Sequence, residues 1–363
     1  MSALATEHGA INLSQGFPGF DAPAGLIEAA ARAMRVGKNQ YAPMPGTLAL
    51  REAIASSLHR PACPYDPQTE ITITAGATQA IFTAINALIR EDDEVIIFTP
   101  AYDCYAPAVE LAGGSVTYIQ MHAPAFRIDW EEVKKVVNRK TRMIVINTPH
   151  NPTGSCLTES DLDELEKIVI DTDIIVLSDE VYEHILFDGR THASCASRAP
   201  LCEQSLIVGS FGKSFHLTGW KIGYIAGPEA LMVEFRKVHQ YNVFCVNHPL
   251  QVALAEFMSE HPEHCSQLST FYQQKRDLFL SALEGSRFSI VPAEGSYFQL
   301  LDYSAISDEE DMAIAEKWTR EIGVASIPVS AFYHNPVDVK VLRFCFAKED
   351  ATLLAAAERL KSL

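Results

Sequence analysis

The chain has 363 residues, of which 48% are hydrophobic and 21% are charged, and its formal net charge is −17 at pH 7. This balance is typical of a folded globular protein and excludes a disordered chain, while the acidic charge argues against a nucleic-acid partner, because phosphate binding requires clustered lysine and arginine. No apolar stretch is long enough to span a bilayer and the N-terminal residues carry no signal pattern, so we expect a cytoplasmic protein with no membrane partner.

The segment from residue 70 to residue 227 alternates short β-branched runs with helical stretches. Helical patterns cover residues 77–90 and 157–171, and the second contains Thr158-Glu-Ser-Asp161, a potential capping box. Nearly continuous apolar strands that alternate with helices predict a mostly parallel sheet covered on both faces. The predicted strands are residues 71–74, 94–98, 115–119, 142–147, 173–178, 205–208 and 221–225.

The pattern changes after Pro228, where long helical patterns continue to about residue 284 and short strands and helices follow. This mixture of helical and strand patterns predicts a smaller α+β lobe, and we expect the N-terminal segment to pack on it. We therefore expect a large domain at residues 31–259 and a small domain formed by residues 1–30 and 260–363. In the small lobe the predicted strands are residues 288–291, 296–301 and 341–346, and the predicted helices are residues 309–321 and 349–360.

A glycine-flanked lysine, Lys213, follows the predicted strand at residues 205–208 in the run Ser210-Phe-Gly-Lys213. Open α/β sheets place their chemistry at such strand ends. A second lysine, Lys221, follows, and both a cationic neighbour and partial burial lower the pKa of a lysine amine. Lys213 could therefore hold an aldehyde cofactor as a Schiff base, although a lone Ser-x-x-Lys is more often a solvated loop.

A turn of small residues, Thr74-Ala-Gly-Ala77-Thr78-Gln, joins a predicted strand to a predicted helix. Small residues let backbone N–H groups approach an anion, and the helix N-terminus adds a favourable dipole, so this turn could hold a phosphate. The G-x-G-x-x-G dinucleotide fingerprint is absent, and a merely tight turn is the alternative.

Two further strands end in motifs with Tyr102 and Asn151. The ring of Tyr102 could lie face-on against a planar ring. Asn151, between His150 and Pro152 in a rigid polar turn, offers an amide in a fixed direction. Half-buried packing and an ordinary turn are the alternatives for these two motifs.

The run Ser178-Asp179-Glu-Val-Tyr182 ends a very apolar strand. A carboxylate is costly to bury there unless a cation pairs with it. The protonated nitrogen of a pyridine ring would be such a partner, and the ion pair would make the ring a better electron sink. Tyr182 could reach the phenolic oxygen of the same ring, whereas an aspartate that caps a helix is the alternative.

An arginine, Arg343, lies between apolar residues in the predicted strand at residues 341–346. Its planar guanidinium fits a substrate carboxylate through two parallel hydrogen bonds. An internal salt bridge is the alternative explanation.

The sequence predicts no metal site. None of the eight cysteines forms a C-x-x-C pair. His261-Pro-Glu-His264 lacks a third ligand, and its histidines are expected at a helix start.

Together and in this order, the motifs resemble the class I, fold-type-I aminotransferases, which depend on pyridoxal 5′-phosphate (PLP). The resemblance covers essentially the whole chain and is greatest for the bacterial methionine aminotransferases, relatives of the kynurenine–glutamine aminotransferases. It implies an α/β fold with a large domain, built on a mostly parallel seven-stranded sheet between helices, and a smaller α+β domain. The motifs that carry it are Asn-Leu-Ser-Gln-Gly-Phe-Pro (12–18), Asn-Gln-Tyr-Ala-Pro (39–43), Thr-Ala-Gly-Ala-Thr (74–78), Thr-Pro-His-Asn-Pro (148–152), Ser-Asp-Glu-Val-Tyr (178–182) and Ser-Phe-Gly-Lys (210–213).

The resemblance also implies a role for each candidate residue. Lys213 would form the Schiff base with PLP and act as general base and acid, and Asp179 would pair with the pyridine nitrogen. Arg343 would bind the substrate α-carboxylate, assisted by Asn151 and the backbone of Gly16. The other implied cofactor contacts are Tyr182 and Asn151 at the phenolic oxygen, Tyr102 stacked on the ring, and Ala77, Thr78, Ser210 and Lys221 at the phosphate.

The resemblance further implies a homodimer with shared active sites. Tyr41 would reach the phosphate of the neighbouring subunit, and Phe244 would line the neighbour's substrate pocket. The implied reaction moves the amino group of methionine and other large neutral or aromatic L-amino acids to a 2-oxo acid. The loop at residues 241–248 contains no arginine for a second substrate carboxylate, which argues against aspartate as the preferred donor.

Two features depart from the family pattern. The family pattern usually begins earlier, with an N-terminal segment whose aromatic residue covers the substrate pocket. We therefore expect either that the sequence starts at an internal methionine of a longer protein or that the protein lacks this covering segment. Gly19 stands where relatives usually carry an acidic residue, and we expect little chemical consequence.

Two other functions remain as alternatives. A PLP-dependent cysteine-S-conjugate β-lyase would use the same Lys213 and Asp179 but would expel the sulfur group of its substrate. A cofactor-binding regulator is the second alternative. No helix-turn-helix pattern precedes the fold and all the core cofactor residues are present, which argues against a regulator.

Overall fold

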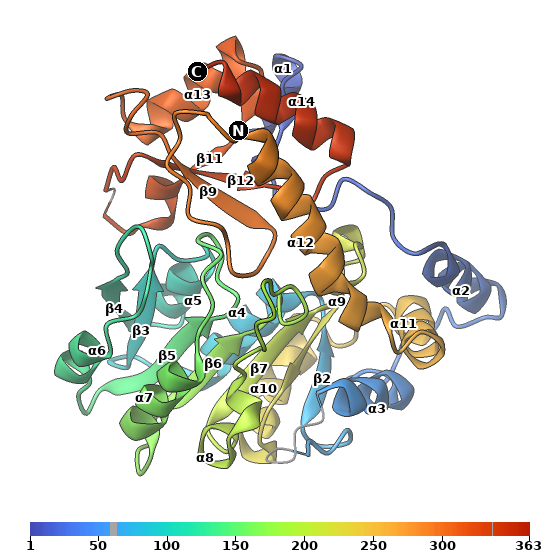
Figure 1. The fold of residues 1–363 in the computed structure, drawn as a ribbon. Helices are drawn as coiled ribbons and strands as arrows, with labels where there is room; N and C mark the ends of the chain where they lie inside the picture. The colour runs from blue at the N-terminus through green and yellow to red at the C-terminus, as the bar shows by residue number, and fades with distance from the viewer. Residues whose placement is uncertain (59–63, 336) are drawn as a thin grey trace.

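The computed structural model describes residues 1–58, 64–335 and 337–363. Figure 1 shows a large sheet flanked by helices and, stacked at one end of it, a smaller lobe built mainly from the C-terminal part of the chain. The two parts are joined by the long helix α12 (His264–Ala282), which runs from the side of the large sheet into the smaller lobe.

The large sheet has seven strands in the order β2-β8-β7-β6-β5-β3-β4, and β8 alone runs antiparallel to its neighbours. This confirms the predicted mostly parallel sheet, with strand ends that differ slightly from those expected. The strands are β2 (Ile71–Thr74), β3 (Glu94–Thr99), β4 (Ser115–Gln120), β5 (Thr141–Asn147), β6 (Ile175–Asp179), β7 (Ser205–Ser210) and β8 (Gly223–Ala226).

Helices cover both faces of this sheet, because successive strand side chains point to opposite sides. Ile97 packs on one face under α4 (Ala77–Leu88), α5 (Tyr105–Leu111) and α10 (Glu229–Asn242), whereas its neighbour Ile96 packs on the other face. The second face is covered by α6 (Trp130–Val136), α7 (Glu159–Val169) and α8 (Ala199–Cys202). The predicted capping box is confirmed at α7, where the side chains of Thr158 and Asp161 each accept a hydrogen bond from the other's backbone N–H.

The smaller lobe contains the antiparallel sheet β11-β12-β9 and a short parallel pair, β1 with β10. Its strands are β1 (Ile11–Asn12), β9 (Phe298–Asp302), β10 (Val324–Ala325), β11 (Ile327–Pro328) and β12 (Val341–Cys345). Its helices are α1 (Ser2–Glu7), α12, α13 (Asp311–Glu321), α14 (Asp350–Lys361) and the 3-10 helix η3 (Val329–Phe332).

The predicted strand at residues 288–291 is wrong. Only Ser289 forms an isolated bridge there, to Asp302. Pro292 follows directly, and a proline has no backbone N–H to donate to a neighbouring strand. Val291 is also 54% exposed, so the run does not bury a continuous face.

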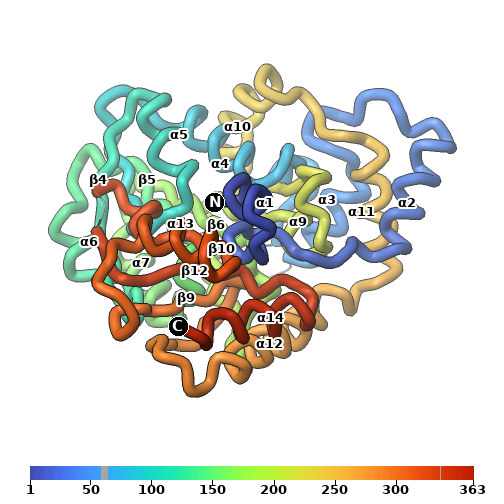
Figure 2. The backbone as a smooth tube through the Cα atoms, turned by 90° about the horizontal axis from the view of Figure 1, so that it is seen from above, coloured from blue at the N-terminus to red at the C-terminus, as the bar shows by residue number. Residues whose placement is uncertain are grey.

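The N-terminal segment crosses from one lobe to the other. Figure 2 places α1 beside the C-terminal lobe and α2 (Ala24–Arg35) on the opposite side, against α11 (His248–Glu260) and near α3 (Leu48–Ser57). The division expected between residues 30 and 31 therefore falls inside α2, and the domain limits stay a prediction.

The remaining helical segments are the four-residue helix α9 (Phe211–Ser214) and the 3-10 helices η1 (Cys195–Ser197) and η2 (Thr218–Trp220). Across the described residues, none of the helices combines the length and the apolar character that crossing a membrane requires.

Candidate active site

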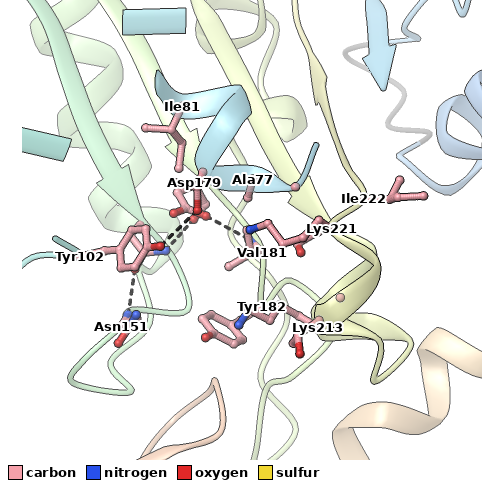
Figure 3. Close-up of a pocket in the computed structure, with 16 residues that line it drawn as sticks. Ala77, Ile81, Tyr102, Asn151, Asp179, Val181, Tyr182, Lys213, Lys221 and Ile222 are labelled. Carbon is pink, nitrogen blue, oxygen red and sulfur yellow. Dashed lines mark hydrogen bonds between the residues drawn. The ribbon is translucent and has the colours of Figure 1, made fainter. Parts of the chain in front are cut away.

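A pocket lies where the carboxyl ends of β5, β6 and β7 meet the N-terminus of α4. Figure 3 shows Tyr102, Asn151, Asp179, Lys213 and Lys221 around it. Parallel strands bring their carboxyl ends to one edge of the sheet, and this is the edge at which open α/β sheets bind ligands. The residues that line it are Gly76, Ala77, Thr78, Ile81, Tyr102, Asn147, Asn151, Asp179, Val181, Tyr182, Ser210, Gly212, Lys213, Thr218, Lys221 and Ile222. They include every predicted cofactor contact except Tyr41.

One side of the pocket can hold an anion. Ala77 and Thr78 open α4, so their backbone N–H groups belong to the first turn of that helix. Gly76 precedes them with φ +80°, and a Cβ there would lie 3.2 Å from the Nζ of Lys221. The turn therefore requires glycine both for its conformation and for the close approach of this ammonium group. Ser210, at the end of β7, lines the same pocket.

Asp179 ends β6 and is 4% exposed. Its Oδ2 accepts a 2.6 Å hydrogen bond from the hydroxyl of Tyr105, and its Oδ1 accepts a 3.3 Å bond from the backbone N–H of Val181. Burial raises the pKa of Asp179 to about 6, and these two hydrogen bonds oppose that shift. A cation placed in the pocket would stabilise the ionised form further.

Lys213 lies in α9 and points its amine into the pocket. The Nζ donates hydrogen bonds to the Oη of Tyr297 at 2.8 Å and to the carbonyl oxygen of Gly16 at 3.2 Å. Burial lowers the pKa of Lys213 to about 8, and Lys221 contributes in the same direction. The lowered pKa makes the amine a better nucleophile near neutral pH.

Tyr182 and Tyr102 lie at different places in the pocket. The Tyr182 ring is 2% exposed, and the Nζ of Lys213 lies 5.6 Å from its centroid. The hydroxyl of Tyr102 lies 3.1 Å from the Oγ1 of Thr78, and its ring contacts Tyr105 edge-on at 5.7 Å. Tyr102 is thus held by the turn that begins α4.

Arg343, on β12, reaches the pocket from the smaller lobe. Its Nη1 donates a 2.6 Å hydrogen bond to the Oδ1 of Asn151, and its Nη2 donates a 3.1 Å bond to the carbonyl oxygen of Ser14. The guanidinium carbon lies 4.0 Å from the ring centroid of Phe298 and 4.7 Å from that of Phe332. Cation–π contacts with two aromatic rings therefore help to hold the guanidinium in place.

The Nε of Arg343 is buried and has no hydrogen-bond partner among the described residues. A buried donor without a partner is costly, so this arrangement favours an additional acceptor such as a carboxylate. No acidic side chain pairs with Arg343 among the described residues, so the internal salt bridge considered above is not found there.

Tyr41 and Phe244 do not line this pocket. Tyr41 is 81% exposed and Phe244 is 38% exposed, and the two rings contact each other edge-on at 5.3 Å. Gly16 does approach the site, but its carbonyl faces Lys213, whereas the backbone partner of Arg343 is Ser14.

Comparison with known proteins agrees with this geometry. The sequence profile of the family "Aminotransferase class I and II" matches residues 8–360. The chain belongs to this aminotransferase family. Class I aminotransferases use PLP and act on amino acids and 2-oxo acids.

Individual relatives match over nearly their whole length. The methionine aminotransferase of Escherichia coli is 50% identical over 365 residues, which are 100% of this chain and 94% of that protein. A crystal structure of an E. coli protein with a methionine aminotransferase function has a TM-score of 0.98 at 49% identity and covers 100% of this chain and 96% of that one.

More distant relatives differ in their named substrates. The N-succinyldiaminopimelate aminotransferase structure from Mycobacterium tuberculosis has a TM-score of 0.95 at 36% identity, with 100% and 95% coverage. The kynurenine–oxoglutarate transaminase of Dictyostelium discoideum is 33% identical over 404 residues, 100% of this chain and 92% of that protein. The predicted family and fold type are thus confirmed.

The site of this aminotransferase fits PLP. The first turn of α4 and Lys221 suit a phosphate, the amine of Lys213 suits an aldehyde, and the buried carboxylate of Asp179 suits a cationic ring nitrogen. The buried Nε of Arg343 suits the carboxylate of an amino acid.

Sequence patterns do not predict several residues at the site. Tyr105 stands three positions after Tyr102, but no local pattern reveals its hydrogen bond to Asp179. Tyr297, Phe298 and Ser14 come from other parts of the chain, and only the packing of the two lobes brings them to the pocket.

One group of potential metal ligands occurs in the described part of the chain: Glu180, Glu183 and His192. Protein groups already bind both carboxylates. The Oε2 of Glu180 lies 2.7 Å from the Nε2 of His192, and Glu183 accepts a 2.7 Å hydrogen bond from Tyr224. This group carries no argument for a metal ion.

Proposed function

We propose that this aminotransferase binds PLP through Lys213 and moves the amino group of methionine and other large neutral or aromatic L-amino acids to a 2-oxo acid. The observation that carries the proposal is the convergence of Lys213, Asp179 and Arg343 on one pocket. The donor preference is supported by the E. coli methionine aminotransferase, which is 50% identical over this whole chain.

The cofactor site divides into three parts. Ala77, Thr78, Ser210 and Lys221 hold the phosphate. Asp179 pairs with the ring nitrogen, and this ion pair offsets the cost of burying its carboxylate. Tyr102 and aliphatic side chains of the pocket would line the ring, and Asn151 and Tyr182 would bind its phenolic oxygen.

Lys213 performs the proton transfer. When bound, PLP supplies an aldehyde that condenses with amines and a protonated ring that withdraws electrons from the substrate α-carbon. The Nζ of Lys213 accepts the proton from that carbon and later returns a proton, acting as general base and then general acid. A pKa near 8 suits both roles, because neither protonation state is scarce near neutral pH.

Arg343 orients the amino acid for this step. Its guanidinium binds the α-carboxylate, assisted by Asn151 and the backbone near Gly16. The two aromatic rings that contact the guanidinium help to hold it in place, so the bound substrate presents its α-carbon in a fixed direction.

In the proposed homodimer, each of the two active sites contains residues from both subunits. Tyr41 and Phe244 form an exposed aromatic pair outside the pocket of their own chain, which supports their roles at the neighbour's phosphate and substrate pocket. Mixing Tyr41→Ala chains with Lys213→Ala chains should restore activity at one site per mixed dimer. Absence of any recovery in mixed dimers of confirmed composition would contradict shared sites.

A substrate panel tests the proposed reaction. Rates with methionine, phenylalanine, glutamine and aspartate should be highest for methionine or phenylalanine, and a clear preference for aspartate would overturn the donor class. Release of pyruvate and thiol from a cysteine conjugate without an added 2-oxo acid would instead identify a β-lyase.

A further inference from the structure

Tyr297 contacts the amine of Lys213 from the smaller lobe. Its side chain is fully buried, and its hydroxyl lies 2.8 Å from the Nζ of Lys213 and 2.6 Å from the carbonyl oxygen of Gly16. No local sequence pattern pointed to this residue, which stands just before β9.

The backbone on both sides of Tyr297 is fixed by hydrogen bonds. Ser296 has φ +64°, and its N–H donates to the carbonyl oxygen of Ile185 at 2.9 Å. The carbonyl oxygen of Tyr297 accepts a 3.0 Å bond from the N–H of Phe346. The hydroxyl is therefore held at the pocket by a rigid segment rather than by a mobile loop.

The hydrogen-bond pattern gives the hydroxyl a definite orientation. A phenol has one proton, and a carbonyl oxygen can only accept, so Tyr297 donates its proton to Gly16. The oxygen of Tyr297 then presents its lone pairs to Lys213, which donates to it. Burial raises the pKa of Tyr297 well above its ordinary value, so the phenol stays protonated and keeps this orientation.

These two acceptors determine how the amine of Lys213 is oriented. A neutral amine has two N–H bonds and one lone pair in a tetrahedral arrangement. When the N–H bonds point to Tyr297 and to Gly16, the lone pair points away from both. In this remaining direction the lone pair can attack an aldehyde or accept a proton.

A neighbouring tyrosine shows that this contact is specific. Tyr272 lies beside Tyr297, with ring centroids 5.8 Å apart, and is equally buried. Its hydroxyl has no hydrogen-bond partner among the described residues. Of these two tyrosines, Tyr297 thus contacts Lys213 through its hydroxyl, whereas the Tyr272 hydroxyl forms no hydrogen bond within the described part of the chain.

We propose that Tyr297 is a positioning residue for Lys213: together with the Gly16 carbonyl it holds the lysine amine, whenever that amine is not bonded to the cofactor, with its lone pair available to the pocket. The inference rests on the proposed function, in which this amine first binds PLP and then transfers the substrate proton. It adds a residue that acts through Lys213 and does not itself touch the substrate.

The test compares Tyr297→Phe with Tyr272→Phe, because each removes one buried hydroxyl from the same cluster. In cofactor-free protein, the rate at which added PLP becomes fixed to Lys213 is followed by borohydride reduction and mass spectrometry of the modified peptide. Tyr297→Phe should slow this rate about 2- to 10-fold, the range expected for losing one hydrogen bond between neutral groups. Tyr272→Phe should leave it unchanged.

The loaded enzymes provide a second readout. Tyr297→Phe should lower kcat with little change in KM and should increase the isotope effect of an α-deuterated substrate, because the proton transfer alone is slowed. Equal loading rates and equal isotope effects in wild type and Tyr297→Phe would overturn the inference. Equal losses in both tyrosine variants would also overturn it, since they would indicate a packing role only.

A double-mutant cycle covers the case in which Tyr297→Phe is poorly stable. The urea midpoints of wild type, Tyr297→Phe, Lys213→Ala and the double variant are compared, and the proposed contact predicts that the two effects do not add. Additive effects would contradict the contact. If the wild-type chain itself never fixed PLP to Lys213, the proposed function would fail, and this outcome differs from a chain that loads PLP equally well with and without the Tyr297 hydroxyl.

Discussion

The hydroxyl of Tyr105 donates a 2.6 Å hydrogen bond to the Oδ2 of Asp179 inside the protein core. Tyr105 is 3% exposed, and burial holds its pKa well above the ordinary value, so it remains a donor. This bond stabilises the ionised form of a carboxylate whose burial favours the neutral form. The Tyr105 hydroxyl thus helps to keep Asp179 charged in the core.

Removing that hydroxyl should weaken the cofactor site. In Tyr105→Phe the pKa of Asp179 should rise above its present value of about 6, so less of the carboxylate is ionised at neutral pH. We expect the Kd for PLP to increase about 10-fold, measured by equilibrium dialysis, as is typical of one lost hydrogen bond to a charged group. Tyr272→Phe is the control, and an unchanged Kd in Tyr105→Phe would contradict this role.

Asp179 should destabilise the cofactor-free protein at neutral pH. Its pKa rises from 3.8 to about 6 on folding, so between these values the folded state binds more protons than the unfolded chain and stability falls as pH rises. A shift of about two units corresponds to about 3 kcal/mol. Asp179→Asn, which carries no charge, should therefore be more stable than wild type at pH 7 by up to about 3 kcal/mol.

Urea unfolding of both proteins without PLP, measured from acidic to neutral pH, checks this prediction. The advantage of Asp179→Asn should vanish at pH values below the unfolded pKa of 3.8, where the wild-type carboxyl is neutral in both states. An Asp179→Asn variant that is less stable than wild type at neutral pH would contradict the prediction. It would show that protein hydrogen bonds already offset the cost of burying the Asp179 carboxylate.

Gly76→Ala should weaken PLP binding through the phosphate. The added Cβ would lie 3.2 Å from the Nζ of Lys221, and the residue would need φ +80°. Gly189 also has a positive φ, +72°, and a Cβ there would have no atom within 4 Å, so Gly189→Ala is a control that places an alanine at positive φ without crowding a neighbour. Both variants should lose about 1–3 kcal/mol of stability, but only Gly76→Ala should raise the Kd for PLP. Equal Kd values in the two variants would contradict the proposed phosphate site.

Arg343→Lys should weaken amino-acid binding and leave PLP binding intact. Lysine keeps the charge but cannot form two parallel hydrogen bonds to a carboxylate or contact Phe298 and Phe332 through a planar guanidinium. We expect KM for the amino-acid donor to increase about 10- to 100-fold. Arg359→Lys, an exposed change in α14, is the matched control. A normal KM in Arg343→Lys would exclude Arg343 as the carboxylate site.

The amine of Lys213 should react at lower pH than is usual for lysine. Burial lowers its pKa from 10.5 to about 8, so half of the amine is neutral near pH 8 in the cofactor-free protein. Labelling with a limiting amount of an acylating reagent at several pH values, with the exposed Lys38 as internal reference, should show an inflection of Lys213 near this pH. An inflection near the ordinary value of 10.5 would refute the shift.

Local sequence patterns determined the strands of the large sheet and the position of most of the site residues along the chain. Runs of β-branched residues predicted every strand of the large sheet, because strand formation and helix capping depend on neighbouring residues. The motifs at strand ends located Lys213, Asp179 and Asn151, since parallel strands bring their carboxyl ends to one edge. The strand predicted at residues 288–291 failed, because a proline and an exposed face interrupt it.

Tertiary structure alone decided which groups touch. Arg343 and Asn151 are 192 residues apart, Lys213 and Gly16 are 197 apart, and Tyr105 and Asp179 are 74 apart. No periodicity specifies such pairs, because each contact depends on how whole helices, strands and lobes pack. The sequence therefore identified the chemical groups of the site, and the packing of the two lobes selected the hydrogen bonds that adjust their charge and orientation.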